Sequence, residues 1–141
     1  MYVLDTNVVS ELRKIRAGKA DWNVAAWTES VDAAGLFVSA LPIMELELGV
    51  LSSERKNATQ GALLRSWMKQ RVLPEFSGRT LPVDTAVAQC CARLHVPDKR
   101  GDRNALIAAT ALVHRMTVVT RNVADFQAAG ASILNPWELI Q

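Results

Sequence analysis

The sequence predicts an α/β domain in which helices cover both faces of a mostly parallel central sheet. Short apolar runs, such as residues 2–5 and 117–120, alternate with longer segments of helical periodicity, which is typical of a parallel sheet. Half of the 141 residues are hydrophobic, enough to build a core. No repeat or linker divides the chain, so we expect a single domain over residues 1–141.

The chain opens with a strand and two helices. The run Tyr-Val-Leu-Asp at residues 2–5 predicts a buried strand that ends in a carboxylate. A helix at residues 6–14 follows, with Thr6 or Asn7 as a plausible N-cap. A second helix is expected over residues 20–33.

The segment after a predicted strand at residues 36–39 fits two secondary structures. Apolar residues between 44 and 50 alternate with polar or small ones, as in a half-exposed strand. Pro42 at a first turn and an apolar stripe at helical spacing favour a helix. The stripe consists of Leu41, Met44, Leu48 and Leu51.

The second half continues the alternation of helices and strands. Its predicted elements, in order, are a helix at 57–72, a short strand within 79–84, helices at 85–95 and 104–115, a strand at 117–120, a loop at 121–126 and a short strand at 131–134. This order again predicts parallel strands joined by helices.

Composition excludes several classes of protein. The formal net charge of +2 is too small to indicate a nucleic-acid binder by bulk charge. No segment approaches the roughly 20 apolar residues of a membrane span, and an acid interrupts the N-terminal run before it could resemble a signal peptide. We therefore expect a soluble, cytoplasmic protein that does not bind a membrane.

The two cysteines are adjacent, at positions 90 and 91. A disulfide between neighbours is strained, so reduced residues in or near the core are expected. With only His95 and His114 nearby in the sequence, a Cys/His zinc site is improbable.

Three carboxylates fall where the predicted strands end. In an open α/β sheet, ligands bind beyond the carboxyl ends of the strands. Asp5 ends the first strand, Asp125 follows the strand at 117–120, and Glu45 lies on the helix after the strand at 36–39. The side chains could therefore meet at one edge of the sheet.

Glu47 competes with Glu45 for the third position. Two residues apart on a helix point about 200° away from each other, so only one can face the sheet edge. Gly49 lies one turn after Glu45 and leaves space beside it. We therefore choose Glu45 and expect Glu47 to be a solvated neighbour.

Asn104 opens a predicted helix whose small residues, Ala108 and Ala111, allow it to lie close to the sheet. The side chain of residue 104 would then lie near Asp5. An aspartate there would complete a cluster of four carboxylates, whose repulsion Mg²⁺ or Mn²⁺ relieves. Bound metal could activate water for in-line attack on a phosphodiester.

Each of these residues also has an ordinary explanation. Asp5 and Asn104 could be helix caps, Asp125 a turn former and Glu45 an exposed helix acid. No single residue makes the case for a metal site.

Several motifs together resemble those of PIN-domain ribonucleases, and most closely the VapC and FitB-like toxins of bacterial type II toxin–antitoxin pairs. The motifs are LDTNVVSEL, MELELG, NALIAATAL, TVVTRNVADF and the closing LNPW, in the family's order and spacing along essentially the whole chain. LDTN alone would be weak, and the joint agreement is what makes the resemblance specific.

The resemblance implies a Rossmann-like α/β/α fold and a Mg²⁺-dependent endoribonuclease that cuts RNA, often structured RNA such as tRNA. It places the metal-binding and catalytic residues at Asp5, Glu45, position 104 and Asp125, with Asn7 and Thr120 as supporting polar groups. The partners it implies are a homodimeric second copy and a VapB-like antitoxin, through which alone operator DNA would be contacted.

Position 104 departs from the family, whose motif is normally DALIAATA. Asparagine keeps an oxygen ligand and the shape but removes one negative charge, so affinity for Mg²⁺ should fall. Asp102 could compensate if it lies in the loop, but not if the helix already includes it. The natural protein could carry Asn104 and be a weak or inactive nuclease, or the residue could have been changed to make a toxic enzyme tolerable in an expression host, which is the explanation we favour.

Functions of other classes fit less well. A haloacid-dehalogenase-like phosphatase would need an acid where Asn7 stands, and a receiver domain would need a lysine where Arg121 stands. The serious rival is a non-catalytic module of the same fold that binds an antitoxin or RNA without turnover. Metal-dependent RNA cleavage distinguishes it from the enzyme.

Two basic clusters are candidates to hold RNA phosphates or an acidic antitoxin tail. The predicted phosphate-binding residues are Arg13, Lys14, Arg100 and Arg103. Most large apolar residues are expected in the core rather than at a partner surface, although some could line a groove for an antitoxin helix. This set comprises Trp22, Trp27, Leu63, Leu64, Trp67, Met68 and Trp137.

Overall fold

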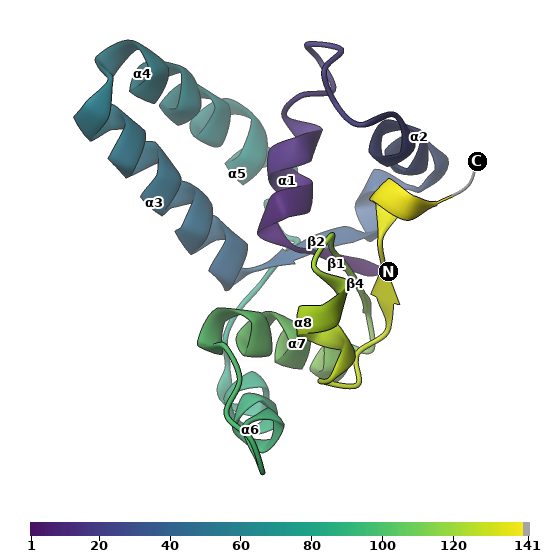
Figure 1. Cartoon of the computed structure of the whole chain (residues 1–141). Helices are drawn as coiled ribbons and strands as arrows, with labels where there is room; N and C mark the ends of the chain where they lie inside the picture. The colour runs from purple at the N-terminus through teal and green to yellow at the C-terminus, as the bar shows by residue number, and fades with distance from the viewer. Residues whose placement is uncertain (140–141) are drawn as a thin grey trace.

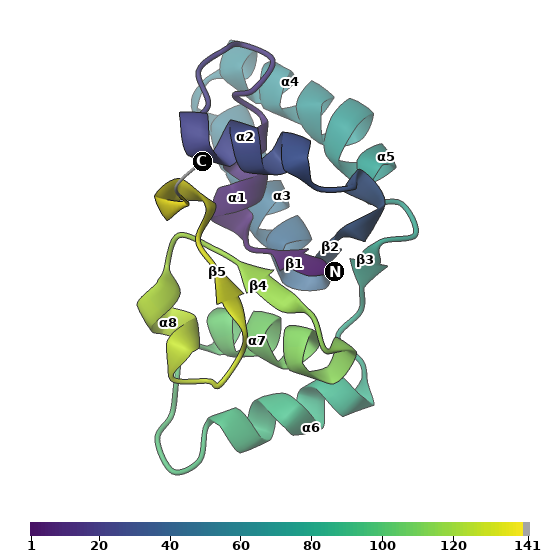
Figure 2. The same cartoon turned by 90° about the vertical axis from the view of Figure 1, so that its right-hand side faces the viewer.

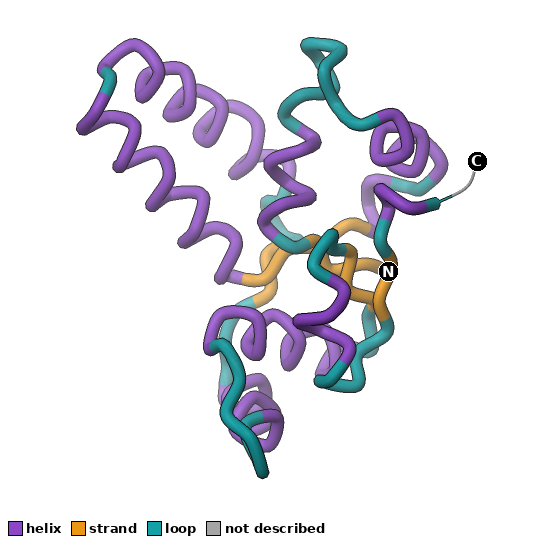
Figure 3. Tube along the Cα trace, viewed as in Figure 1, coloured by secondary structure: helices purple, strands orange, loops and turns teal. Residues whose placement is uncertain are grey.

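The computed structural model describes residues 1–139 and contains a five-stranded parallel sheet at its centre (Figure 1, Figure 3). The strands lie in the order β3-β2-β1-β4-β5, which confirms the predicted parallel α/β fold. Their bounds are Tyr2–Leu4 (β1), Leu36–Ser39 (β2), Thr80–Leu81 (β3), Thr117–Val119 (β4) and Ile133–Leu134 (β5).

Helices cover both faces of this sheet. Helices α1 to α5 lie on one side and α6 and α7 on the other, with α8 beside α7 (Figure 1, Figure 2). Their bounds are Thr6–Leu12 (α1), Trp22–Ser30 (α2), Ala40–Lys56 (α3), Ala58–Trp67 (α4), Leu73–Glu75 (α5), Thr85–Leu94 (α6), Asp102–His114 (α7) and Val123–Gln127 (α8). Short turns η1 (Ala33–Gly35), η2 (Met68–Val72, π-helical) and η3 (Pro136–Glu138) complete the chain. None of the described helices combines the length and apolar character needed to cross a membrane.

Alternate residues of the central strands build two separate cores. Leu4 and Val119 face α1 to α4, whereas Val3 and Val118 face α7 and α8. All four are fully buried, and burying such a side chain stabilises the fold by roughly 1.5–3 kcal/mol. Strands buried on both faces read as continuous apolar runs, which is why the short run at residues 2–5 predicts a strand.

The alanine-rich face of α7 packs directly on the sheet. Ala108 and Ala111 are buried beside Val3 and Val118, as their small size predicts. Helix α6 covers the outer side of α7 through Val87, and the free thiols of Cys90 and Cys91 lie in the same core. The N-terminal turn of α7 is thereby held near the carboxyl ends of the strands.

The register places two carboxyl ends next to each other. Leu4 of β1 pairs with Val119 of β4, and the N–H of Asp5 donates to the carbonyl of Val119 over 2.9 Å. Asp5 and Thr120, the residues that follow these strands, therefore begin at the same edge of the sheet.

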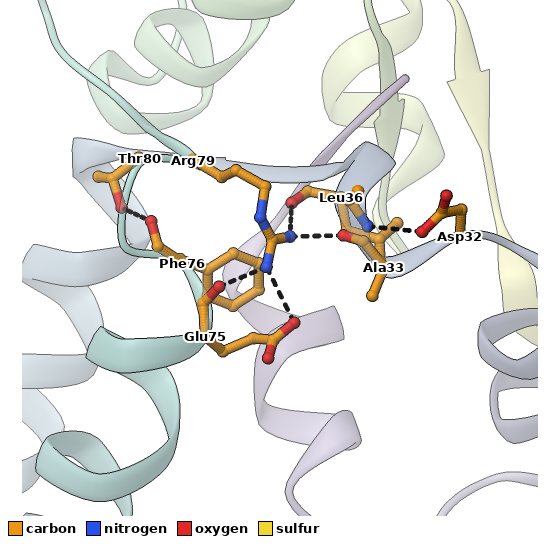
Figure 4. Close-up of polar contacts among 8 residues, drawn as sticks. Asp32, Ala33, Leu36, Glu75, Phe76, Arg79 and Thr80 are labelled. Carbon is orange, nitrogen blue, oxygen red and sulfur yellow. Dashed lines mark hydrogen bonds and ion pairs between the residues drawn. The ribbon is translucent and has the colours of Figure 1, made fainter.

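Arg79 holds the edge strand β3 to the rest of the sheet (Figure 4). Its guanidinium donates to the carbonyl of Ala33, which precedes β2, and over 2.6 Å to the carbonyl of Leu36, the first residue of β2. It also donates to both the carbonyl and the carboxylate of Glu75. The group also lies over the ring of Phe76, 5.4 Å from its centroid. One arginine thus accepts no bond but donates to carbonyls of two segments, the one that leads into β2 and the one that leads into β3.

Several predicted bounds were wrong. The predicted loop at 121–126 contains α8, which is too short for periodicity to reveal and is held by the fully buried Phe126. The predicted helix at 57–72 is broken by the π-helical turn after Trp67, while α3 runs on to Lys56.

The expected burial of two large apolar side chains was also wrong. Trp22 and Leu63 were expected in the core, yet they are 80% and 63% exposed.

The prediction that Glu47 is a solvated neighbour of Glu45 was also wrong, because Glu47 is paired with an arginine. It forms a two-bond ion pair with Arg65 at 2.6 and 2.8 Å, and Arg65 also binds Glu54. These bonds join α3 to α4. The choice of Glu45 over Glu47 for the sheet edge is compatible with this pairing, because Glu47 is engaged elsewhere.

Candidate active site

Asp5 is the most deeply placed acid of the candidate site. It follows β1, is only 4% exposed and is the N-cap of α1, where its Oδ1 accepts the N–H of Thr6 over 2.8 Å. Neither Thr6 nor Asn7 is the cap, contrary to prediction. Capping uses one carboxylate oxygen, so it does not account for the second.

The second oxygen of Asp5 is held by the supporting residues that the sequence points to. Its Oδ2 accepts the hydroxyl of Thr120 over 2.8 Å and the amide of Asn7 over 3.4 Å. Thr120 is itself fixed, because its hydroxyl oxygen accepts the N–H of Asn122 over 3.0 Å. The ends of β1 and β4 thus orient the Asp5 carboxylate rigidly.

Burial raises the pKa of Asp5 above its ordinary value of 3.8. The bonds from Thr120 and Thr6 lower that pKa, and the negative charge of Asp125 raises it further. A buried acid that a second acid repels is the electrostatic setting in which a cation binds well, because the cation relieves both penalties.

Asp125 and Asn104 meet at the N-terminal turn of α7. Asp125 lies on α8, and its Oδ2 accepts the Asn104 amide Nδ2 over 3.3 Å. Gly101 is the N-cap of α7, so Asn104 lies within the first turn and is not a cap. An aspartate at position 104 would place a like charge here, where the amide now donates a hydrogen bond.

Glu45 reaches the site region from α3. It lines a cavity of about 340 Å³ together with Thr6, Ser10 and Gly49. An added Cβ at Gly49 would meet nothing within 4 Å, as expected for open space beside Glu45. The hydroxyl oxygen of Thr6 is buried and, among the described residues, lacks a hydrogen-bond partner.

The predicted ligands do not form a complete cluster. Within residues 1–139, no three His, Cys, Asp or Glu side chains lie close enough together to hold a metal ion. The charge of Asp125 acts on Asp5, whereas Glu45 lines the cavity beside Thr6. The donor set of carboxylate, amide and hydroxyl oxygens, with an unpartnered Thr6 hydroxyl, nevertheless fits a hard divalent cation.

Asp102 does not lie where it could replace the missing charge. It is the first residue of α7, its side chain is 72% exposed, and its Oδ1 lies 3.7 Å from the Nε2 of His95. The condition under which compensation was possible, a loop conformation at residue 102, is not met.

Three of the four predicted basic residues line the same cavities as the acids. Arg13 and Lys14 border the cavity of Glu45, and Arg100 borders a cavity of about 330 Å³ with Asn104 and Asp125. Arg100 is partly engaged, since its Nε donates to the carbonyl of Leu94 over 2.7 Å. Arg103 is exposed at the start of α7.

The sequence motifs do not identify two residues that lie near these acids. Thr6 reads as a helix cap, and Arg121 stands where a receiver domain would have a lysine. Arg121 lines a cavity of about 360 Å³ that also contains Asp125. Its position directly after Thr120 is a signal that could have identified it.

Comparison with known proteins supplies the family. Residues 2–131 match the PIN domain family model. The chain belongs to the PIN domain family. This PIN domain is 36% identical to the VapC ribonuclease Y4jK of Sinorhizobium fredii, over 98% of the chain and 99% of that protein. It is also 36% identical to the toxin FitB of Neisseria gonorrhoeae, over 97% of the chain and 99% of that protein.

A solved structure shares the fold of this PIN domain. The structure of FitAB bound to a DNA fragment superposes with a TM-score of 0.88 at 35% identity, covering 100% of this chain and 99% of that one. The expected Rossmann-like PIN fold is therefore confirmed.

Proposed function

We propose that this PIN domain is the toxin of a type II toxin–antitoxin pair and that its framework is that of a metal-dependent endoribonuclease. The observation that carries the proposal is the buried Asp5 carboxylate, held by Thr6 and Thr120 and repelled by Asp125. Relatives that match along the whole chain bear the names VapC ribonuclease and toxin FitB, which supports the same conclusion.

Asp5, Glu45, Asn104 and Asp125 are the residues that we propose would hold Mg²⁺ or Mn²⁺. When bound, the cation would activate water and stabilise charge on the attacked phosphodiester of RNA, such as tRNA. Thr120 and Asn7 keep the Asp5 carboxylate oriented. Arg13, Lys14, Arg100 and Arg103 are proposed to hold RNA phosphates around the site.

Asn104 is proposed to weaken this activity. Its amide donates to Asp125, so Asp125 is already stabilised without a cation. Asparagine also leaves three carboxylates where the family has four, which lowers the attraction for a divalent cation.

The proposed partners follow from the family and from the surface. A groove of about 310 Å³ between α1, α4 and the η2 turn is lined by Leu12, Ile15 and Trp67 and bordered by Arg13 and Arg71. It suits an amphipathic segment of a VapB-like antitoxin that carries acidic residues. We further propose a homodimer, since Met44, Leu48 and Leu51 form an exposed apolar stripe on α3. Operator DNA would be contacted only through the antitoxin, in the cytoplasm.

Restoring aspartate at position 104 tests the function. We expect N104D to cleave RNA in Mg²⁺ at least about tenfold faster than the parent chain, because one carboxylate ligand is regained. Chelator should abolish that cleavage, and N104D with D5N should be inactive. If N104D is no more active or toxic than the parent, the account of Asn104 fails.

A non-catalytic module is the second candidate. The bond from Asn104 to Asp125 favours it, because it satisfies Asp125 without a metal. RNA or antitoxin binding by N104D without any metal-dependent cleavage would establish this alternative.

A further inference from the structure

Arg121 holds its guanidinium at the edge of the candidate site. It directly follows Thr120, whose hydroxyl binds Asp5. The backbone N–H of Arg121 donates to the side-chain oxygen of Asn7 over 3.5 Å. Arg121 lines the cavity that also contains Asn122, Asp125 and Glu138. The backbone of Arg121 is therefore fixed by the same network that fixes the Asp5 carboxylate.

The Arg121 side chain is fixed as well. Its guanidinium carbon lies 5.2 Å from the ring centroid of Trp137, a cation–π distance. Trp137 is held in turn, because its carbonyl accepts the Asn23 side chain of α2 over 2.8 Å and its N–H donates to Asn135. An arginine on an otherwise exposed surface thus has a preferred position.

Stacking leaves the donors of Arg121 available. The guanidinium carbon lies over the Trp137 ring, and among the described residues Arg121 donates a hydrogen bond only through its backbone N–H. Within residues 1–139 the guanidinium forms no ion pair at 4 Å or less. The charge of Arg121 helps to lower the pKa of the nearby Glu11, but the carboxylate of Glu11 is bound directly by the N–H of Asp21 and by Lys14 rather than by Arg121.

We infer that Arg121, stacked on Trp137, binds a phosphate of the RNA strand beside the phosphate that is cleaved. The inference rests on the proposed function for the identity of the ligand. A planar guanidinium with free edge donors is suited to the oxygens of a phosphate. Its cavity contains Asp125, so the bound phosphate lies next to the reacting centre. Arg121 is therefore a positioning residue for the substrate.

Binding of a short, unpaired, fluorescently labelled RNA of mixed sequence to the parent chain tests the inference. We expect R121Q to bind roughly tenfold more weakly, because a hydrogen bond between charged groups is lost. The slope of log affinity against log salt should fall by about 0.7, the contribution of one phosphate on a single strand. R121K should keep that slope but lose part of the affinity, since it keeps the charge without the planar fork.

Two further variants control the measurement. R55Q removes an exposed arginine at the far end of α3 and should leave affinity and slope unchanged. W137F keeps an aromatic face and should bind nearly as the parent does, whereas W137L should weaken binding with the charge intact. Melting temperatures of all variants verify that they are folded.

The outcomes separate this inference from the proposed function. If the parent binds no RNA, or if R121Q matches R55Q, the inference is overturned, and cleavage by N104D would still support the nuclease. If R121Q weakens RNA binding while N104D never cleaves, the contact of Arg121 with an RNA phosphate is supported and the nuclease proposal is overturned. The same variants are also tested for binding to an acidic peptide. If R121Q weakens binding of the peptide but not of the RNA, Arg121 binds carboxylates of a protein instead, and the inference is overturned.

Discussion

At the residue scale, the surroundings of the Asp5 carboxyl group have opposing effects on its pKa. Its burial and the charge of Asp125 favour the protonated form, and the Thr120 and Thr6 bonds favour the ionised form. Burial dominates, so the pKa in the folded protein lies above the ordinary value of 3.8. Such an acid makes the fold less stable when it is ionised, which is characteristic of functional sites.

The substitution Asp5→Asn tests this directly. The folded state holds the Asp5 proton more tightly than the unfolded state, so stability falls as pH rises from 3.8 through the folded-state pKa. Asparagine lacks this penalty, and its oxygen can still accept the Thr6 N–H. Its amide nitrogen cannot accept the bonds from Thr120 and Asn7, which reduces the gain but leaves the removal of the buried charge as the larger effect. We expect a melting temperature at neutral pH that is on the order of a few degrees higher than that of the parent. The gain should shrink as pH approaches 3.8.

Asp84→Asn is the matched control for that experiment. Asp84 caps α6 by accepting the N–H of Val87, but it is exposed to solvent. Its substitution should give no gain at neutral pH. A D5N protein that is less stable than the parent at every pH would contradict the electrostatic account of Asp5.

At the scale of elements, the hairpin of α3 and α4 depends on one glycine. A Cβ at Gly61 would lie 2.4 Å from the Cα of Glu54, whereas a Cβ at Gly49 would meet nothing within 4 Å. The close approach lets Arg65 of α4 reach both Glu47 and Glu54 of α3. Glu47 is thereby kept away from the side of α3 that carries Glu45.

Two alanine substitutions compare these glycines. Both gain the helix propensity of alanine, about 0.8–1.0 kcal/mol. G49A should therefore stabilise the protein slightly, while G61A should destabilise it by roughly 1–3 kcal/mol because the Glu54 backbone must shift. Urea unfolding measures both free energies. Equal stabilities for the two variants would show that the helices do not approach as closely as described.

At the scale of the whole molecule, the sequence predicted the parallel sheet because its buried strands are short, continuous apolar runs. It could not predict α8, whose five residues carry less than two turns of periodicity. The Arg65 and Arg79 clamps were equally hidden, since their partners are distant in sequence. Burial of Trp22 and Leu63 was wrongly expected, because apolar character alone does not say which helix face meets the core.

The part of the candidate site that lies at the ends of parallel strands could be predicted from the sequence. Asp5 and Thr120 follow paired strands, so their proximity follows from the parallel register. The meeting of Asn104 with Asp125 depends on α8 and could not be read from the strands. The contribution of Glu45 stays a prediction, since among the described residues no three acidic, Cys or His side chains lie close enough together to hold a metal ion.

Binding of Mn²⁺, followed by electron paramagnetic resonance, tests most directly whether four elements supply one cation site. We predict that N104D binds Mn²⁺ roughly tenfold more tightly than the parent, because a charged ligand replaces an amide. D5N and Glu45→Gln should each bind it more weakly than the parent. Equal affinity for Mn²⁺ in all four proteins would contradict the shared site.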